Sequence, residues 1–360
     1  MQKVETENLT SNFDQLRGSG AAELLEAYCS PFLSIEWWQC WHRHFGSDSR
    51  VTVIIEDRVT STLLLTEIHQ ESYKGLPLRV LRSIVNSHSA RAALAFSDNH
   101  IAEQACALAI NIASNTEWDV MRLQGIPYQP NDFAQTFCQQ LTKLGCPAHI
   151  ERTWAHDALD FPTEWSAYYQ SLSKETRRVQ ERMGRRLREL GTVTWKQCAD
   201  SEQLALGFAE FLALERRSWK AVAGEIINDH PSIRGFYADV VEVFGHKRRC
   251  QIDLLYLDQT CICAVISLLN RQRLTTIKTS FDVTYAKYSP GWQLFRYLLE
   301  DAHNRAIRQV DFYADLDFSK RWANTRYPFC DIIAFSPSWR GRISRAAKQG
   351  IEAWRRVASS

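Results

Sequence analysis

Three consecutive residues in the C-terminal half, Ser289, Pro290 and Gly291, have the types needed to hold an anion at the start of a helix. Serine is a favoured N-cap, proline suits the first helical position, and glycine leaves room for a ligand to approach the backbone. The free N–H groups of such a helix start attract phosphates, and a pyrophosphate fits them well. A plain helix cap explains the same three residues equally well.

Polar residues on both sides of this turn could move protons or fix a substrate. Asp282 ends the preceding predicted strand and is the first candidate for a base or an acceptor anchor, although a turn-forming aspartate is common there. Tyr313, in the next predicted strand, could protonate a leaving group or be structural. Asp317 and Lys320 follow in a charged loop, where Lys320 could contact a substrate or be a solvated charge.

The elements that must position these residues form a predicted βαβ crossover. The pattern predicts a strand over 274–282, a helix over about 290–306 and a second strand over 309–314. A strand, a capped helix and a parallel return strand make this unit. The loop 285–291 would then lie where the helix presents its N–H groups.

Composition sets wider limits. The chain has 360 residues, 45% hydrophobic and 23% charged, which is globular composition with length for about two domains. With a net charge of +2, the molecule as a whole is not a polyanion binder, so any basic surface must be local. Ten cysteines without a CxxC pair or a Cys/His ligand spacing predict free thiols in a reducing cytoplasm and no metal site. Neither a signal peptide nor a membrane-spanning run is visible.

The same order of elements is predicted in both halves: helices, a β-meander, a helix, a parallel strand, a helix and a last strand. In the first half these are an amphipathic piece over 21–28, a helix capped by Ser34, strands over 51–56, 62–67 and 78–85, a helix over 99–113, a strand over 119–124, a helix over 132–144 and a strand over 148–154. In the second half they are a strand over 192–196, helices from Ser201 and Ser232, strands over 251–257, 261–269 and 274–282, the helix over 290–306, the strand over 309–314, a short helix near 319–324 and a strand over 330–335. We therefore predict an α/β (α+β) chain of two tandem domains.

Two basic segments flank the second half. One long helix is predicted over 164–190, and its basic stretch, which includes Arg177, could bind an anionic acceptor such as a nucleotide sugar, a lipid-linked sugar or tRNA. A solvated linker helix is the simpler interpretation. The tail 338–357 is a basic amphipathic helix that could rest on an acidic membrane surface or cover the sheet. The predicted bounds are 1–163 for the first domain, 164–190 for the basic linker helix, 191–337 for the second domain and 338–360 for the tail helix.

Four stretches in this order resemble the GNAT acyltransferase superfamily, and more closely its double-GNAT branch. The branch includes cellulose- and exopolysaccharide-associated acetyltransferases and the Fem-type transferases that build peptidoglycan bridges. The stretches are Ser171–Lys174 with Arg177 and Arg178, Phe211–Lys220, Phe281–Gly291, and Asp311-Phe312 followed by Asp317, Phe318, Lys320 and Trp322. The lysine stands two residues before Trp322 where the family usually spaces it three before, so Ser319 or Lys320 could occupy its position.

The resemblance implies two tandem GNAT-like domains, each a mixed, mostly antiparallel sheet flanked by helices, with acetyl-CoA or another acyl-CoA as co-substrate. It implies a catalytic set of Asp282, Tyr313, Asp317 and Lys320. It implies cofactor contacts at Tyr285, Tyr288, Ser289, Pro290 and Gly291. Substrate contacts are expected at Glu215, Trp219, Arg177, Asn86 and Arg91, although Trp219 also fits the core. The first domain is expected to bind no cofactor, because Asn86–Arg91 replaces its Pro-Gly helix start.

The acceptor class stays open at this point. An N- or O-acyltransferase acting on a small molecule or on a sugar, polysaccharide or cell-envelope precursor is the first interpretation. A Fem-type transferase using aminoacyl-tRNA is the alternative, although the two-helix coiled-coil insertion typical of many Fem enzymes is not visible. A degenerate, non-catalytic scaffold is the third. Nucleic acid other than tRNA is not expected, and the oligomeric state is not specified by the sequence.

Overall fold

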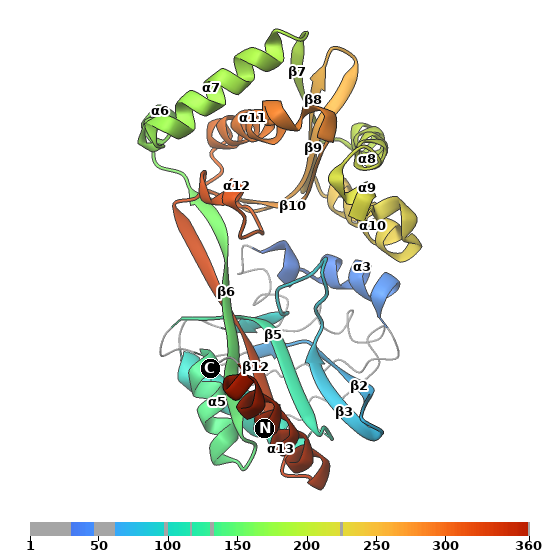
Figure 1. Ribbon diagram of the computed structural model, residues 1–360, viewed down its shortest axis with the longest axis vertical. Coiled ribbons are helices and arrows are strands. Elements are labelled where there is room, and N and C mark those ends of the chain that lie inside the picture. Colours follow the sequence, from blue (N-terminus) through green and yellow to red (C-terminus); the bar gives the residue numbers. More distant parts are fainter. Residues whose placement is uncertain are drawn as a thin grey trace. The chain divides into compact units, whose positions relative to one another are not determined.

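The computed structural model describes residues 30–46, 62–96, 100–115, 117–129, 133–223 and 226–358 (Figure 1). The described residues form two compact units. Those within 47–154 and 327–360 make the first unit, and those within 29–46 and 155–326 make the second. Each unit therefore combines segments that are distant in the sequence, whereas the predicted domains were continuous. The predicted amphipathic piece 21–28 and the strand 51–56 lie outside the described residues.

The second unit is a sheet with helices on both faces. Its strand order is β6-β11-β10-β9-β8-β7, with bounds Ala148–Asp160, Gln309–Asp311, Arg273–Phe281, Thr260–Asn270, Cys250–Leu257 and Val193–Cys198. The meander β8-β9-β10 is antiparallel, as predicted, and β10 runs parallel to β11. Helices α8 (Ser201–Glu215), α9 (Trp219–Ala223) and α10 (Pro231–His246) lie on one face, and α11 (Pro290–Asn304) lies on the other (Figure 1).

An apolar core under α11 holds the second unit together. Leu294, Phe295 and Leu298 of α11 pack against Val265 of β9 and Leu274 of β10. Their spacing is the i, i+1, i+4 pattern of one helix face, which is why the sequence predicted a helix here. On the opposite face, α3 (Ile35–Phe45) packs on α10, where Trp37 meets Phe236 edge-on at 5.1 Å. Ser34 caps α3 as predicted, since its side chain accepts from Trp37 N–H.

The first unit repeats the parallel crossover. Its strands are β2 (Thr66–Tyr73), β3 (Leu76–Ser83), β5 (Val120–Pro127) and β12 (Thr325–Phe335), with a small pair of β1 (Thr62–Leu64) and β4 (Leu94–Phe96). β3 runs parallel to β5 and is joined to it through α4 (Ile101–Asn115), while β12 is antiparallel to β5. Helices α4 and α5 (Phe133–Lys143) cover the main core of this unit. Both units are thus mixed, mostly antiparallel sheets flanked by helices, as predicted.

The last strands are exchanged between the two halves. Residues 158–160 of β6, which follows the first crossover in sequence, pair with β11 of the second unit. Residues 329–335 of β12, which follows the second crossover, pair with β5 of the first unit. The prediction expected each half to close with its own last strand.

Two other predicted elements need correction. The single helix over 164–190 is wrong: the chain forms α6 (Trp165–Ser171) and α7 (Lys174–Arg188), because the Ser173 side chain accepts from Thr176 N–H and starts a new helix. The strand over 309–314 ends at Asp311. The tail is helix α13 (Trp339–Ala358), as predicted. No helix within the described ranges is long and apolar enough to cross a bilayer.

Candidate active site

The central feature of the site is the separation of β10 from β11. Their parallel register starts at Arg273–Gln309 and its last pair is Thr275–Asp311. The Thr276 hydroxyl then donates to the Phe312 carbonyl at 3.1 Å, and β10 continues to Phe281. A bulge at Ile277 interrupts the register with β9 at the same level. Within the described residues, the last part of β10 therefore keeps one edge without a strand partner.

The helix start beside this edge is open. Ser289 is the N-cap residue of α11, but it adopts a left-handed conformation (φ 52°, ψ 56°) and its side chain makes no capping hydrogen bond. Pro290 occupies the first turn, and a Cβ added to Gly291 would meet nothing within 4 Å. The Ser289 carbonyl accepts from Trp292 N–H. Gly291 N–H has no protein acceptor among the described residues, so it can donate to a bound anion.

The loop before this helix is held by Asp282. Its carboxylate accepts from Arg217 Nε at 2.8 Å and from Thr284 N–H at 2.9 Å, and it caps the short helix η3 (Val283–Tyr288). These donors outweigh the cost of burial and lower the pKa of the Asp282 carboxyl. The carboxylate is therefore suited to fixing the loop, and its low pKa makes it a weak proton acceptor.

The predicted phosphate contacts Tyr285 and Tyr288 both lie on η3 and are partly buried against the core under α11. Lys287 stacks its ammonium over the Tyr288 ring at 5.1 Å. Arg321 stacks over the ring of Trp292, in the first turn of α11, at 4.6 Å. Two cations are thus held near the N-terminal end of α11.

Tyr313 lies just beyond the point where the strands separate. Its φ of 51° is unusual for a bulky residue, and Asp311 Oδ1 accepts from its N–H at 2.9 Å. Its ring stacks on Phe32 at 4.4 Å and meets the ring of His156 at 4.9 Å. The prediction placed Tyr313 within a strand, but β11 ends at Asp311 and Tyr313 follows it outside the strand.

The charged loop after Tyr313 splits into an exposed and a buried part. Lys320 pairs with Asp315 at 3.0 Å, and both side chains are exposed. Ser319 is buried and donates to Asp157 at 2.6 Å. Asp317 is exposed at the start of α12 (Asp317–Lys320). Of the two residues considered for the family lysine position, only Lys320 presents its side chain to solvent.

Two predicted acceptor contacts lie differently from expectation. Glu215 is fully buried, where it pairs with Lys220 at 3.0 Å and accepts from Ile227 N–H, so its carboxylate fixes α9 and faces no cleft. Lys220 also donates to the Thr279 carbonyl of β10. Trp219 is 51% exposed, which contradicts the core interpretation. Lys220 connects α9 to β10 through this hydrogen bond. Trp219, the first residue of α9, is therefore on a helix that is attached to the strand with the unpaired edge.

The other predicted substrate contacts occupy separate places. Asn86 accepts from the N–H groups of His88 and Ser89 in its own turn, and Arg91 stacks over Phe329 at 4.9 Å; both belong to the first unit. Arg177 lies on α7, where its Nε donates to the Leu172 carbonyl. Their roles as substrate contacts stay predictions.

The matching family model has the description "Acetyltransferase (GNAT) domain" and covers residues 174–326. Residues 174–326 of this chain are similar to a GNAT acetyltransferase domain. The GNAT domain begins at α7 and contains the separated strands and the open helix start. The match confirms the predicted resemblance to the GNAT superfamily and the acyltransferase class.

Solved structures share the fold over almost the whole chain. The C-terminal domain (DUF2156) of an Agrobacterium fabrum protein named as a lysylphosphatidylglycerol synthetase is 9% identical, with 94% of this chain and 96% of that chain covered and a TM-score of 0.53. FemX is 11% identical, with 92% and 97% covered and a TM-score of 0.53. A conserved Bacteroides thetaiotaomicron protein of unknown function is 9% identical, with 93% and 100% covered and a TM-score of 0.52. At such identities the likeness is one of fold. No curated protein matches the sequence.

Sequence reasoning did not single out three residues of this candidate site. His156 comes from the extension of β6 beyond the predicted end at 154, and Lys278 follows the bulge in β10. Tyr237 of α10 lies under the Lys278 ammonium at 5.2 Å. Burial raises the pKa of Tyr237, with smaller contributions from Tyr313 and Glu215 nearby. Only the strand pattern of β6, which continues past residue 154, could have indicated His156. Among the described residues, no cluster of His, Cys, Asp or Glu is placed to hold a metal ion.

Proposed function

We propose that the second unit is an acyl-CoA-dependent N- or O-acyltransferase, with acetyl-CoA as the first candidate. The observation that carries the proposal is the edge of β10 that has no strand partner among the described residues, together with the open N–H of Gly291. The amides of the pantetheine arm would pair with β10 residues 276–281 in the manner of strand addition. The pyrophosphate would accept from Gly291 N–H, with Lys287 and Arg321 adding positive charge.

The proposed chemistry is transfer of the acyl group from the thioester to an amine or hydroxyl. The acceptor atom forms the new bond to the acyl carbon while the C–S bond breaks, and the acceptor's proton must leave as the thiolate gains one. Tyr313 is the proposed donor to the thiolate, because it follows β11 at the point where that strand separates from β10. Asp282 would act by holding the loop, whereas Lys320 and Asp317 would lie at the exposed rim.

The acceptor would enter where Tyr313, His156 and Lys278 gather. Lys278 brings a cation to this end of β10, and Trp219 offers an exposed ring on which a sugar could stack. An anionic sugar, polysaccharide or cell-envelope precursor fits these features, as the resemblance implied. Arg177 of α7 is a further proposed acceptor contact within the second unit.

Titration of the full chain with CoA tests the proposal. We expect CoA and acetyl-CoA to raise the melting temperature, because a ligand bound only by the native state stabilises it. Gly291→Trp fills the open space at the helix start and is expected to abolish the shift. Gly350→Trp is the matched control, since a Cβ at Gly350 also meets nothing within 4 Å and the residue lies in the first unit. An equal CoA shift in Gly291→Trp would disprove the proposed phosphate site.

A Fem-type transfer from aminoacyl-tRNA is the second candidate. The fold shared with FemX and the exposed arginines of α7 favour it. Against it, α6 is only seven residues long, too short to form one arm of a coiled coil. Stabilisation by aminoacyl-tRNA without any effect of CoA would select this candidate. No shift with either ligand would leave the third interpretation, a GNAT-fold scaffold.

A further inference from the structure

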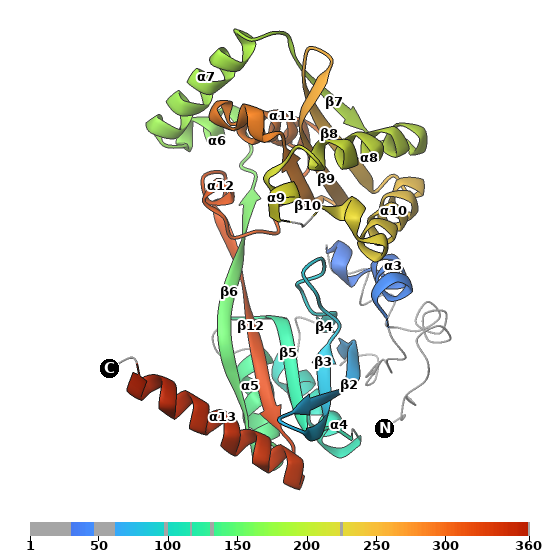
Figure 2. The same cartoon turned by 45° about the vertical axis from the view of Figure 1, so that its right-hand side comes forward.

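The C-terminal helix α13 faces the first unit with its small and polar side. Gly341 packs so closely that an added Cβ would lie 2.4 Å from the Ser336 carbonyl oxygen and 2.9 Å from that of Asp119. Ser344, one turn later, is buried, and Lys348 pairs with Glu151 of β6. Figure 2 shows α13 beside the sheet of this unit. The close contacts of Gly341, Ser344 and Lys348 with this unit are therefore made by small and polar residues.

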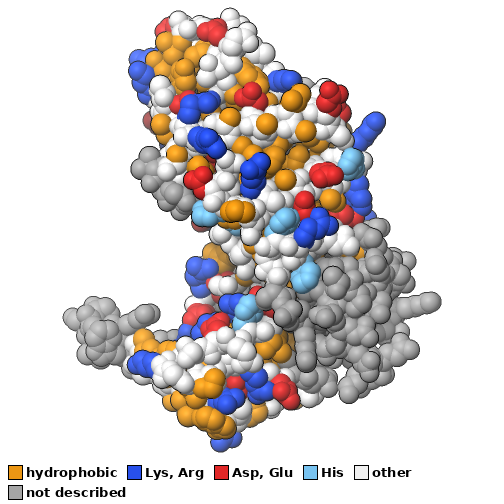
Figure 3. Space-filling view, turned by 90° about the vertical axis from the view of Figure 1, so that its right-hand side faces the viewer, with side chains coloured by type: hydrophobic (Ala, Val, Ile, Leu, Met, Phe, Trp, Pro, Cys, Tyr) orange, Lys and Arg blue, Asp and Glu red, His pale blue; other side chains and the backbone are white. Residues whose placement is uncertain are grey.

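The apolar side of α13 is exposed instead. Trp339 is 60% exposed, Ile343 is 49% exposed and Ile351 is 39% exposed. Trp339, Ile343 and Gly350 lie at helical spacing on the side of α13 opposite Gly341, whereas Ile351 follows Ser344 by seven residues and lies at the border of the two sides. A helix that only covered a core would turn such residues inward. Figure 3 shows hydrophobic side chains next to Lys and Arg side chains on the surface of the described residues.

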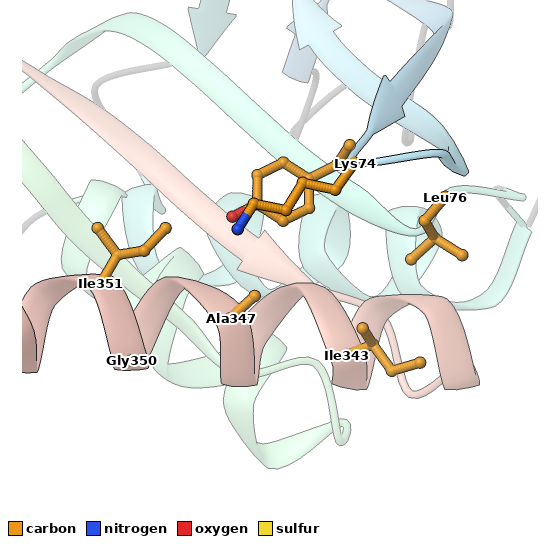
Figure 4. A pocket seen from close by; sticks show the side chains of 7 residues that line it. Lys74, Leu76, Ile343, Ala347, Gly350 and Ile351 are labelled. Atoms are coloured by element: carbon orange, nitrogen blue, oxygen red, sulfur yellow. The ribbon is translucent and has the colours of Figure 1, made fainter.

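An open groove continues this apolar side toward the turn between β2 and β3. It has a volume of about 500 Å³ and lies between Tyr73, Lys74 and Leu76 on one side and α13 on the other. Figure 4 shows Ile343, Ala347 and Ile351 directed from the helix toward Lys74 and Leu76. The apolar surface of α13 and the hairpin tip thus form one face, which we call the tail face.

Cations border the tail face. Arg342 and Arg345 are exposed on one flank of α13, Arg340 lies over the Trp339 ring at 5.2 Å, and Lys74 stands at the hairpin tip. Residues 338–351 contain no acidic side chain, and 338–360 contain six Lys or Arg against one Glu. Exposed Trp and Ile bordered by arginines is the pattern of a helix lying in the interface of an anionic bilayer.

We propose that the tail face docks on an anionic membrane surface. The apolar residues would enter the headgroup boundary, and the arginines would meet lipid phosphates. Nucleic acid would use the cations but would leave the exposed Trp and Ile unpartnered. This surface lies in the first unit, and the proposal does not depend on acyl transfer in the second.

Vesicle co-sedimentation of the full chain tests the proposal. We expect binding to vesicles of phosphatidylcholine with phosphatidylglycerol, weaker binding to phosphatidylcholine alone, and loss of binding at high salt. The double variant Trp339→Ser/Ile343→Ser is expected to lower the partition coefficient by about tenfold or more. Arg342→Gln/Arg345→Gln should reduce binding only to the anionic vesicles.

The matched control is Leu190→Ser/Leu206→Ser, which removes two exposed apolar side chains of the second unit and should leave binding unchanged. Circular dichroism and CoA titration of each variant show that the fold and the second unit are intact. Failure of the chain to bind either vesicle would overturn the proposal. So would equal binding by Trp339→Ser/Ile343→Ser, or a dimer in solution that this variant splits, because the tail face would then bind a second copy.

Discussion

Tyr313 combines a left-handed backbone with a ring packed between two aromatic groups, and such a conformation persists only where its surroundings enforce it. Tyr313→Phe keeps the ring contacts with Phe32 and His156 and removes only the hydroxyl. If that hydroxyl protonates the leaving thiolate, kcat should fall by roughly 10²-fold or more while the KM for acyl-CoA changes little. Steady-state kinetics measures both, with Tyr297→Phe as the control, because the Tyr297 ring stacks on Trp195 and has no proposed role in the site. A kcat within about twofold of wild type would reject the role.

At the residue scale, the sequence indicated what a residue type permits at its position, but it did not indicate which residues the side chain contacts. Gly291 was expected to leave open space, and it does, because glycine has the same consequence wherever a helix starts. Glu215 was expected in a cleft but is buried against Lys220, which stands five residues away across the break between α8 and α9. His156 reached the site through a strand that sequence patterning ended too early. Contacts made by distant segments decide such roles, and local patterns do not contain them.

At the element scale, apolar periodicity located most helices and the β8-β9-β10 meander, because these elements are fixed by near neighbours in the sequence. The break between α6 and α7 was missed, since Ser173 inside a continuous polar pattern resembles any solvated helical serine. The bulge at Ile277 was missed as well, because a bulge leaves no clear signal in alternation.

Strand β8 carries a buried carboxyl that makes the second unit sensitive to pH. Asp253 accepts from Trp195 Nε1, Gln197 Nε2 and Gln251 Nε2, but burial dominates and raises its pKa to about 6 from 3.8. Between these values the folded chain holds a proton that the unfolded chain has released. The free energy of unfolding therefore falls as pH rises from about 4 to about 6.

Asp253→Asn removes this dependence, so the destabilisation it causes should be smaller at about pH 7 than at about pH 5, by about 1 kcal/mol. Urea unfolding of both chains at the two pH values measures the difference. Other carboxyls, such as Asp282 with its lowered pKa, are common to both chains and cancel. A destabilisation that is equal at both pH values would show that Asp253 has an ordinary pKa.

At the scale of the whole molecule, the order of elements was predictable but their assignment to units was not. Both halves contain a parallel crossover, as the repeated order indicated. The exchange depends on pairing between residues about 150 positions apart for β6 and β11 and more than 200 apart for β12 and β5, for which one sequence offers no local signal. The segment 29–46 likewise belongs to the second unit although it precedes the first crossover.

This interleaving predicts that a residue far outside the GNAT domain controls that domain's stability. Trp37 is fully buried and packs on Phe32 and on Phe236 of α10, which lies within 174–326. Trp37→Ala should therefore lower the free energy of unfolding by about 3–5 kcal/mol, whereas Trp339→Ala, at a 60% exposed tryptophan, should change it by less than about 0.5 kcal/mol. Urea unfolding followed by circular dichroism measures both variants. Thermal melting in the presence of CoA follows the GNAT domain separately. The melting temperature of the CoA-bound domain should be lower in Trp37→Ala than in the wild type. Equal stability of the two variants would mean that α3 contributes nothing to the second unit.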